Sequence, residues 1–112
     1  MNNDISIIIP VYNYTIVKNT ILSLSKQYYP GKKEIILIYD NPKVKIDKLF
    51  RLFLKKYNVR LIENKSNLGL AGNYNLGIKE SKYQNMMTIH EDCIMKDKYV
   101  IRNMVNKLDS IP

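Results

Sequence analysis

The stretch that decides the fold is Ile5–Val11, which reads ISIIIPV and consists almost entirely of branched apolar residues. Three more short apolar runs, rich in β-branched residues, follow it at residues 34–39, 59–63 and 85–90. Strands of this composition are expected where helices cover both faces of a sheet, which is the condition for parallel strands. The four runs therefore predict an open, mostly parallel sheet.

The segments between these runs carry apolar residues three or four positions apart, the spacing of one helix face. This spacing begins at Ile16 and continues through Val17, Ile21, Leu24 and Tyr28. The second segment shows it more clearly, at Ile46, Leu49, Phe50, Phe53, Leu54 and Tyr57. Both segments predict helices that connect neighbouring parallel strands.

The last segment, residues 97–108, also predicts a helix, with Asp97 as its N-cap. Its expected buried side consists of Tyr99, Val100, Met104 and Leu108. The predicted order is thus β-α-β-α-β-α-β-α. No linker or repeat interrupts it, so we expect one α/β domain over residues 1–112.

The composition is that of a soluble globular protein, with 46% hydrophobic and 25% charged residues among 112. These values exclude disordered and collagen-like classes. The apolar run near the start has no basic residues before it and is broken by Pro10, so we expect neither a signal peptide nor a spanning helix. The expected location is the cytoplasm.

The net charge of +8 favours an anionic partner such as a nucleotide, a membrane surface or a nucleic acid. The lysines are scattered, however, and no motif of a nucleic-acid module is present, so we expect no specific nucleic acid. A single cysteine, Cys93, and a single histidine, His90, exclude an internal disulfide and a structural zinc site.

Polar residues and glycines gather after the predicted strands, where ligands bind in open α/β sheets. Three of the four glycines, Gly69, Gly72 and Gly77, lie within residues 64–81. They match neither the dinucleotide-binding pattern nor the P-loop. They allow a close turn into a helix whose free N–H groups favour phosphate, or they let that helix lie close on the sheet.

Two acidic sites follow other strands. Glu91 and Asp92 are adjacent at a strand end, so their side chains are expected to point in opposite directions. They suit a sugar hydroxyl and a divalent cation such as Mg²⁺ or Mn²⁺, or they are a solvated acidic pair. Asp40 is placed to accept hydrogen bonds from a base or ribose, or to form a turn.

Taken in order, the segments SIIIPVYN, SLSKQYYPGKKEIILIYDN, NLGLAGNYNLGI and IHEDCIM resemble the inverting glycosyltransferases of family 2. The resemblance covers nearly the whole chain. It implies the Rossmann-like N-terminal half of a GT-A fold, which binds a UDP- or dTDP-sugar with Mn²⁺ or Mg²⁺. It also implies inverting transfer to a glycan or lipid-linked acceptor.

Carried over by position, the resemblance implies roles for individual residues. Asp40 would contact the base, Glu91 the ribose and Asp92 the metal. Glu91 stands where the family usually has Asp, and Cys93 stands where it has an acidic or amide residue. The full set implied for the nucleotide sugar is Pro10, Tyr12, Asn13, Asp40, Asn67, Gly69, Asn73, Gly77 and Glu91.

The resemblance also implies that the acceptor-binding half and the catalytic base lie beyond Pro112, so we expect this chain to be inactive alone. Two other classes remain open. One is a non-catalytic α/β interaction module, and the other is a basic binder of nucleic acids or membrane surfaces. Peripheral membrane contact and self-association are also open, although no helix with a strongly basic face stands out in the sequence.

Overall fold

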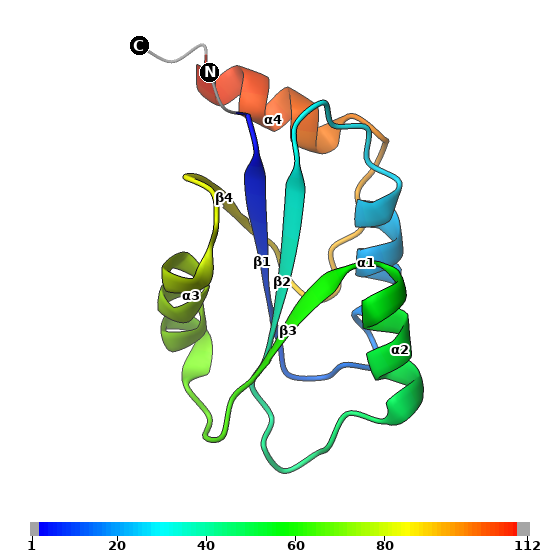
Figure 1. The fold of residues 1–112 in the computed structure, drawn as a ribbon, viewed down its shortest axis with the longest axis vertical. Helices are drawn as coiled ribbons and strands as arrows, with labels where there is room; N and C mark the ends of the chain where they lie inside the picture. Colours follow the sequence, from blue (N-terminus) through cyan, green and yellow to red (C-terminus); the bar gives the residue numbers. More distant parts are fainter. Residues whose placement is uncertain (1–2, 110–112) are drawn as a thin grey trace.

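The computed structural model describes residues 3–109. It has the predicted order of alternating strands and helices (Figure 1). The elements are β1 (Ile5–Val11), α1 (Lys18–Ser25), β2 (Lys33–Tyr39), α2 (Lys48–Lys56), β3 (Val59–Glu63), α3 (Gly69–Glu80), β4 (Asn85–Thr88) and α4 (Val100–Asp109). No helix in this part of the chain is long and apolar enough to cross a membrane.

The four strands form one sheet in the order β3-β2-β1-β4, and every neighbouring pair is parallel. Ile7 lies beside Ile35 of β2, and Ile35 in turn lies beside Val59 of β3. The parallel α/β fold is therefore confirmed. Its parallel pairing brings the carboxyl ends of β1, β2 and β3 to the same edge of the sheet.

The two faces of the sheet are covered unequally, as Figure 1 shows, with α3 on one side and α1 and α2 on the other. Ile8 of β1 packs with Ile36 and Ile38 on the α3 side. The alternate residues of β1 enter a larger core on the opposite side. That core includes Ile5, Ile7, Ile9, Val11, Ile21, Leu24, Phe50, Leu54, Ile101 and Val105. Each such side chain stabilises the fold by about 1.5–3 kcal/mol when fully buried.

The predicted start and buried side of the last helix were wrong. Helix α4 begins at Val100, and Asp97 instead accepts a hydrogen bond from the Tyr99 amide at 2.8 Å in the preceding turn. The residues that enter the core are Ile101 and Val105. Two stripes with helical spacing run along this segment one residue apart, and only packing on the sheet selects one of them.

Three other residues predicted to be buried are exposed. Leu49 of α2 is 78% exposed, because the helix turns the next residue, Phe50, into the core. Successive residues of an α-helix point about 100° apart, so both cannot face inward. Ile16 and Tyr28 flank α1 and are 45% and 54% exposed. The predicted fourth strand is also shorter, ending at Thr88.

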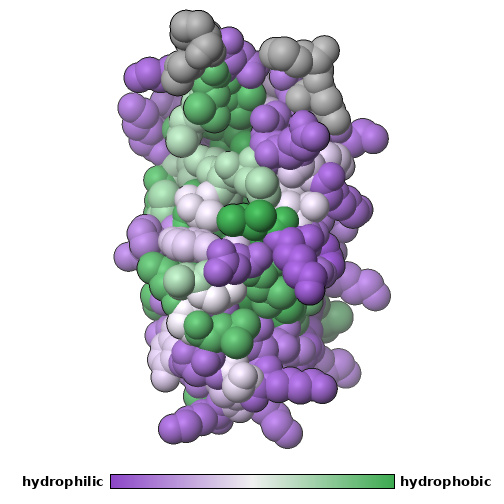
Figure 2. All heavy atoms as spheres, turned by 90° about the vertical axis from the view of Figure 1, so that its left-hand side faces the viewer, coloured by the Kyte–Doolittle hydropathy of each residue, from purple (hydrophilic) through white to green (hydrophobic). Residues whose placement is uncertain are grey.

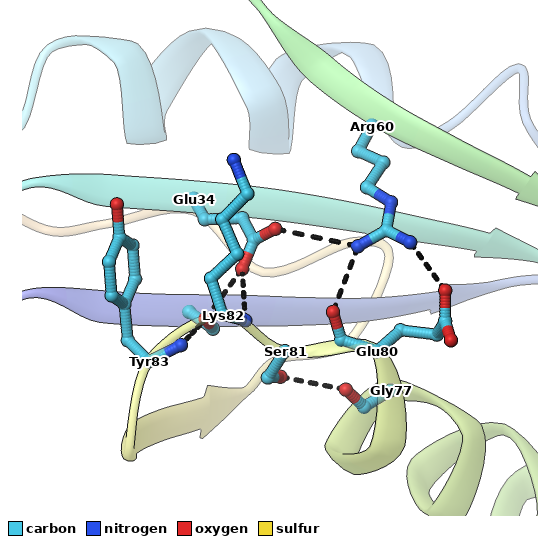
Figure 3. A network of polar contacts seen from close by, with 8 residues as sticks. Glu34, Arg60, Gly77, Glu80, Ser81, Lys82 and Tyr83 are labelled. Atoms are coloured by element: carbon cyan, nitrogen blue, oxygen red, sulfur yellow. Dashed lines mark hydrogen bonds and ion pairs between the residues drawn. The ribbon is translucent and has the colours of Figure 1, made fainter.

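A polar network closes the α3 side at the amino ends of the strands (Figure 3). The carboxylate of Glu34 accepts hydrogen bonds from the Ser6 hydroxyl at 2.7 Å and the Lys82 amide at 2.9 Å. Arg60 of β3 donates to the carbonyl of Glu80 at 2.8 Å and pairs with its carboxylate. These contacts hold the α3–β4 connection against the sheet.

Gly77 lets α3 approach the sheet closely. It is buried, and a Cβ built on it would lie 2.5 Å from Cγ2 of Ile8. This distance leaves no room for a side chain. Of the two roles that the sequence left open for this glycine, close packing on the sheet is the one that the structure supports.

We expect Gly77→Ala to lower the free energy of unfolding by about 2 kcal/mol. Crowding against Ile8 costs up to about 3 kcal/mol, and the better helix propensity of alanine recovers about 1 kcal/mol. Urea unfolding would measure the change. Asn75→Ala, at an exposed position of the same helix, is the control and should be neutral or slightly stabilising. A Gly77→Ala variant as stable as the wild type would contradict this packing role.

Candidate functional site

A pocket of about 310 Å³ lies beyond the carboxyl ends of the strands. It contains every residue predicted to bind a nucleotide sugar except Asn13 and Gly77. Its lining is Pro10, Val11, Tyr12, Asp40, Asn67, Gly69, Leu70, Asn73, His90 and Glu91. The fold therefore brings together residues that are up to eighty positions apart in the sequence.

The sheet ladder positions the first residues of this pocket. The Asp40 amide donates to the Val11 carbonyl at 2.8 Å, and the Asn64 amide donates to the Tyr39 carbonyl at 3.0 Å. Strand-like pairing thus continues one residue beyond β2 and β3. As a result, Asp40 and Asn64 meet beside the start of α3.

Asp40 is the centre of a hydrogen-bond network and is only 5% exposed. Its Oδ1 accepts from the side-chain amide of Asn64 at 2.9 Å and the backbone amide of Leu68 at 2.8 Å. Its Oδ2 accepts from the backbone amide of Gly69 and the side-chain amide of Asn73, each at 3.0 Å. A carboxylate offers about four lone-pair sites, so this side chain is saturated.

These contacts also control the ionisation of Asp40. Burial by itself raises the pKa of the carboxyl, but hydrogen bonds from Asn64, Leu68, Asn73 and Gly69 outweigh burial and lower the pKa below its ordinary value. The side chain is therefore charged at neutral pH. It lies at the amino end of α3, where the helix dipole also favours a negative charge.

This arrangement shows that two of the amides at the start of α3 are not free for phosphate. The amides of Leu68 and Gly69 are already bonded to the carboxylate of Asp40. The four hydrogen bonds to Asp40 occupy the lone pairs of its carboxylate. A contact between Asp40 and a nucleotide base, which the resemblance implied, would need those lone pairs. In this structure, Asp40 is a positioning residue for the loop before α3.

Gly69 allows that loop its turn. Its φ is +72°, in the left-handed region that favours glycine, and no atom lies within 4 Å of a Cβ built on it. Backbone conformation, rather than the close approach of a neighbour, therefore explains glycine here. The side chain of Asn67 supports the turn by accepting from the Gly69 amide at 3.1 Å.

Glu91 joins the loop after β4 to the loop after β1. Its Oε2 accepts from the backbone amides of Tyr12 at 2.9 Å and Asn13 at 3.1 Å. Its carbonyl accepts from the hydroxyl of Thr20 on α1 at 2.8 Å. One carboxylate oxygen of Glu91 thus shapes the pocket wall.

Three predicted site residues lie elsewhere. Asn13 caps its own turn, accepting from the Thr15 amide at 3.0 Å and the Thr15 hydroxyl at 2.6 Å. Gly77 packs on β1, and Asp92 is exposed outside the pocket lining. In the part of the chain that is described, no three His, Cys, Asp or Glu residues gather to hold a metal ion.

Sequence reasoning gave no role to three residues of this region. Asn64 bridges Asp40 at 2.9 Å and Asn73 at 2.8 Å, and its place directly after the third strand was the signal that could have revealed it. His90 and Leu70 line the pocket. Their positions at a strand end and a helix start are weaker signals, because such residues often only face solvent.

A family model described as Glycosyl transferase family 2 matches residues 6–112. The chain belongs to glycosyl transferase family 2. Two curated relatives, both poly-β-1,6-N-acetyl-D-glucosamine synthases of Staphylococcus epidermidis, are 30% identical to it over 94 residues. The match covers 83% of this chain but only 23% of each synthase.

Solved structures support the GT-A fold expected for this family. The TarS protein of S. aureus in complex with UDP-GlcNAc superposes with a TM-score of 0.76 at 21% identity, covering 97% of this chain and 31% of that one. The mannosyltransferase PcManGT of Pyrobaculum calidifontis, in complex with GDP-Man and Mn²⁺, gives 0.79 at 16% identity. This superposition covers 96% of the present chain and 32% of the PcManGT chain.

We expect Asp40→Asn to lower the free energy of unfolding by about 3 kcal/mol, since hydrogen bonds to a buried charge are each worth about 1.5–3 kcal/mol. In this variant, an amide nitrogen would replace one of the two acceptor oxygens. That nitrogen is a donor, so it could not accept the two hydrogen bonds that the oxygen accepted. Urea unfolding would measure the loss. Asp97→Asn removes an exposed carboxylate and should change stability by less than about 0.5 kcal/mol. Equal stability of both variants would contradict the central role of Asp40.

The same carboxylate should make stability depend on pH. Because the folded state lowers the pKa of Asp40, its contribution is complete above the unfolded pKa, about 3.9, and is lost as pH falls through the lower folded value. The stability gap between wild type and Asp40→Asn should stay constant from pH 7 to about 5 and shrink below about 4. Unfolding curves at several pH values would show this, and a gap that widens in acid would contradict it.

Proposed function

We propose that the described residues form the donor-binding part of an inverting glycosyltransferase. The donor is a UDP- or dTDP-sugar, bound with Mn²⁺ or Mg²⁺, and the acceptor is a glycan or a lipid-linked sugar. The observation that carries this proposal is the pocket itself, in which the loops after all four strands meet in a chain of family 2. TarS in complex with UDP and with UDP-GlcNAc supports the donor class.

The pocket offers a nucleotide both apolar and polar contacts. Tyr12 is 56% exposed and lines the pocket, where a base could stack on its ring. Asn67 and His90 also line the pocket and are exposed. Asp40 would act indirectly, by holding the Asn67–Gly69 turn in place. This differs from the direct contact with the base that the resemblance implied for Asp40.

The charge of the pocket favours a divalent cation as cofactor. Its lining, all within the described residues, includes the carboxylates of Asp40 and Glu91 but neither lysine nor arginine. A diphosphate placed beside these carboxylates needs a compensating positive charge. The family resemblance assigns the ion to Asp92, which lies outside the lining but follows Glu91 directly and is exposed. Mg²⁺ is often held by one or two carboxylates together with substrate phosphates, so this sparse ligand set fits.

Bound there, the cation would stabilise the leaving diphosphate. The chain itself would bind and orient the donor. An inverting transfer also requires a base that takes the proton of the acceptor hydroxyl. Asp40 is saturated with hydrogen bonds, and Glu91 holds two backbone amides, so neither fits that role. We therefore infer that these residues alone bind the donor without transferring its sugar.

Calorimetric titration of UDP and dTDP into the chain, with Mn²⁺, Mg²⁺ or EDTA, tests this function. We expect binding that depends on the metal and that Asp92→Asn weakens at least about tenfold, since losing a charged ligand costs more than about 1.4 kcal/mol. Mn²⁺ titration alone gives a second readout of the Asp92 site.

The control for this experiment is Asp97→Asn, which makes the same charge change away from the pocket and should bind as the wild type does. Circular dichroism would verify that each variant is folded. If the folded wild type binds no nucleotide with either metal, the donor-binding proposal fails. A non-catalytic α/β module would then be the better interpretation.

A further inference from the structure

The outer side of α2 exposes two leucines to solvent. Leu49 is 78% exposed and Leu52 is 53% exposed, while Phe50 and Leu54 of the same helix are buried. Residues three positions apart are neighbours on a helix surface, so the two leucines form one small apolar patch. Figure 1 shows α2 at the outside of the molecule, with its outer side directed away from the sheet.

Lysines lie beside this patch. Lys48, Lys55 and Lys56 are all exposed on α2. At about 100° per residue, these three lysines and the two leucines fall within an arc of about 120° of the helix. The expectation that no helix carries a strongly basic face was therefore wrong for α2. We call this surface, made of Lys48, Leu49, Leu52, Lys55 and Lys56, the α2 lysine–leucine face. Lys45, in the loop before α2, is also exposed.

The carboxylates nearest in the sequence offset the charge of these lysines only in part. Asp47 caps α2 by accepting from the Phe50 amide at 2.8 Å, and its other oxygen accepts from the Tyr14 hydroxyl at 3.2 Å. Glu63 is paired with Arg51, at 2.6 Å. The face therefore combines apolar side chains with positive charge that these two acids do not balance.

We propose that the α2 lysine–leucine face docks on an anionic membrane surface. Exposed leucines beside lysines on one helix face match the layers of such a surface, because leucines enter the boundary of headgroups and acyl chains while lysines meet the lipid phosphates. A nucleic acid offers phosphates but no apolar layer for Leu49 and Leu52. The charge and the apolar patch together thus favour a lipid surface.

Docking through α2 would keep the candidate pocket near the membrane. The chain passes from Asp40, in the pocket, to the start of α2 at Lys48 within eight residues. The amino end of α2 accordingly lies toward the carboxyl edge of the sheet (Figure 1). The proposal rests on the surface of α2 alone and does not require that the pocket bind a nucleotide sugar.

Co-sedimentation of the 112-residue chain with lipid vesicles tests the proposal. Vesicles of phosphatidylcholine with 30% phosphatidylglycerol would be compared with pure phosphatidylcholine. We expect binding to the anionic vesicles only, and about a 100-fold weaker partition for Lys48→Gln/Lys55→Gln/Lys56→Gln, at about fivefold per lysine. Leu49→Gln/Leu52→Gln preserves the net charge and should weaken partition at least about tenfold.

The matched control is Met104→Gln/Leu108→Gln, which removes two exposed apolar side chains from α4. It should bind vesicles as the wild type does. Binding that survives Leu49→Gln/Leu52→Gln would show attraction to the net charge alone and would overturn the proposal. Loss of binding only in the α4 variant, or no binding of the folded wild type to anionic vesicles, would also overturn it.

Discussion

The carboxylate of Asp40 accepts hydrogen bonds from four donors on β3's end, the following loop and α3. It follows β2 directly, so it ties the ends of β2 and β3 to the start of α3 at one edge of the sheet. A buried carboxylate is stable only when its lone pairs are occupied and its charge is solvated by dipoles. The amides at the start of α3 meet this need, which fixes where α3 begins and how its loop turns.

The position of α3 depends on this anchor at one end and on polar contacts at the other. Near its middle, Gly77 lets the helix lie on Ile8. At its far end, Arg60 holds Glu80, and the Lys82 amide bonds to Glu34 (Figure 3). Figure 2 views the molecule from the side on which α3 lies and shows apolar areas interspersed with hydrophilic ones. Because the apolar core beneath α3 is small, these polar contacts at its two ends set its place on the sheet.

The pocket derives its character from carboxylates that are already engaged. Asp40 holds the loop before α3, and Glu91 holds the amides of Tyr12 and Asn13. A site with this charge suits a ligand that brings a cation with it. The same two carboxylates hold the pocket walls and supply its negative charge, so a change in either acid would alter both the wall of the pocket and its charge.

Much of the fold could be predicted from the sequence. Runs such as Ile5–Val11 are apolar on both faces, and such strands need helices on both sides, so the parallel α/β order followed directly. The place of the pocket followed as well, since loops after parallel strands share one edge. Gly69 was a reliable signal, because few other residues adopt a φ of +72°.

Tertiary structure alone decided which way each helix turns and which polar groups pair. Leu49 and Phe50 both fit an apolar helical stripe, and contact with the sheet buries one and exposes the other. From the sequence, Asp40 could equally be a ligand contact or a turn residue. The structure shows that its carboxylate accepts hydrogen bonds from the side chains of Asn64 and Asn73, which lie far from it in the sequence. Local sequence determines periodicity and backbone freedom, whereas helix rotation and hydrogen-bond partners depend on groups that meet only after the chain has folded.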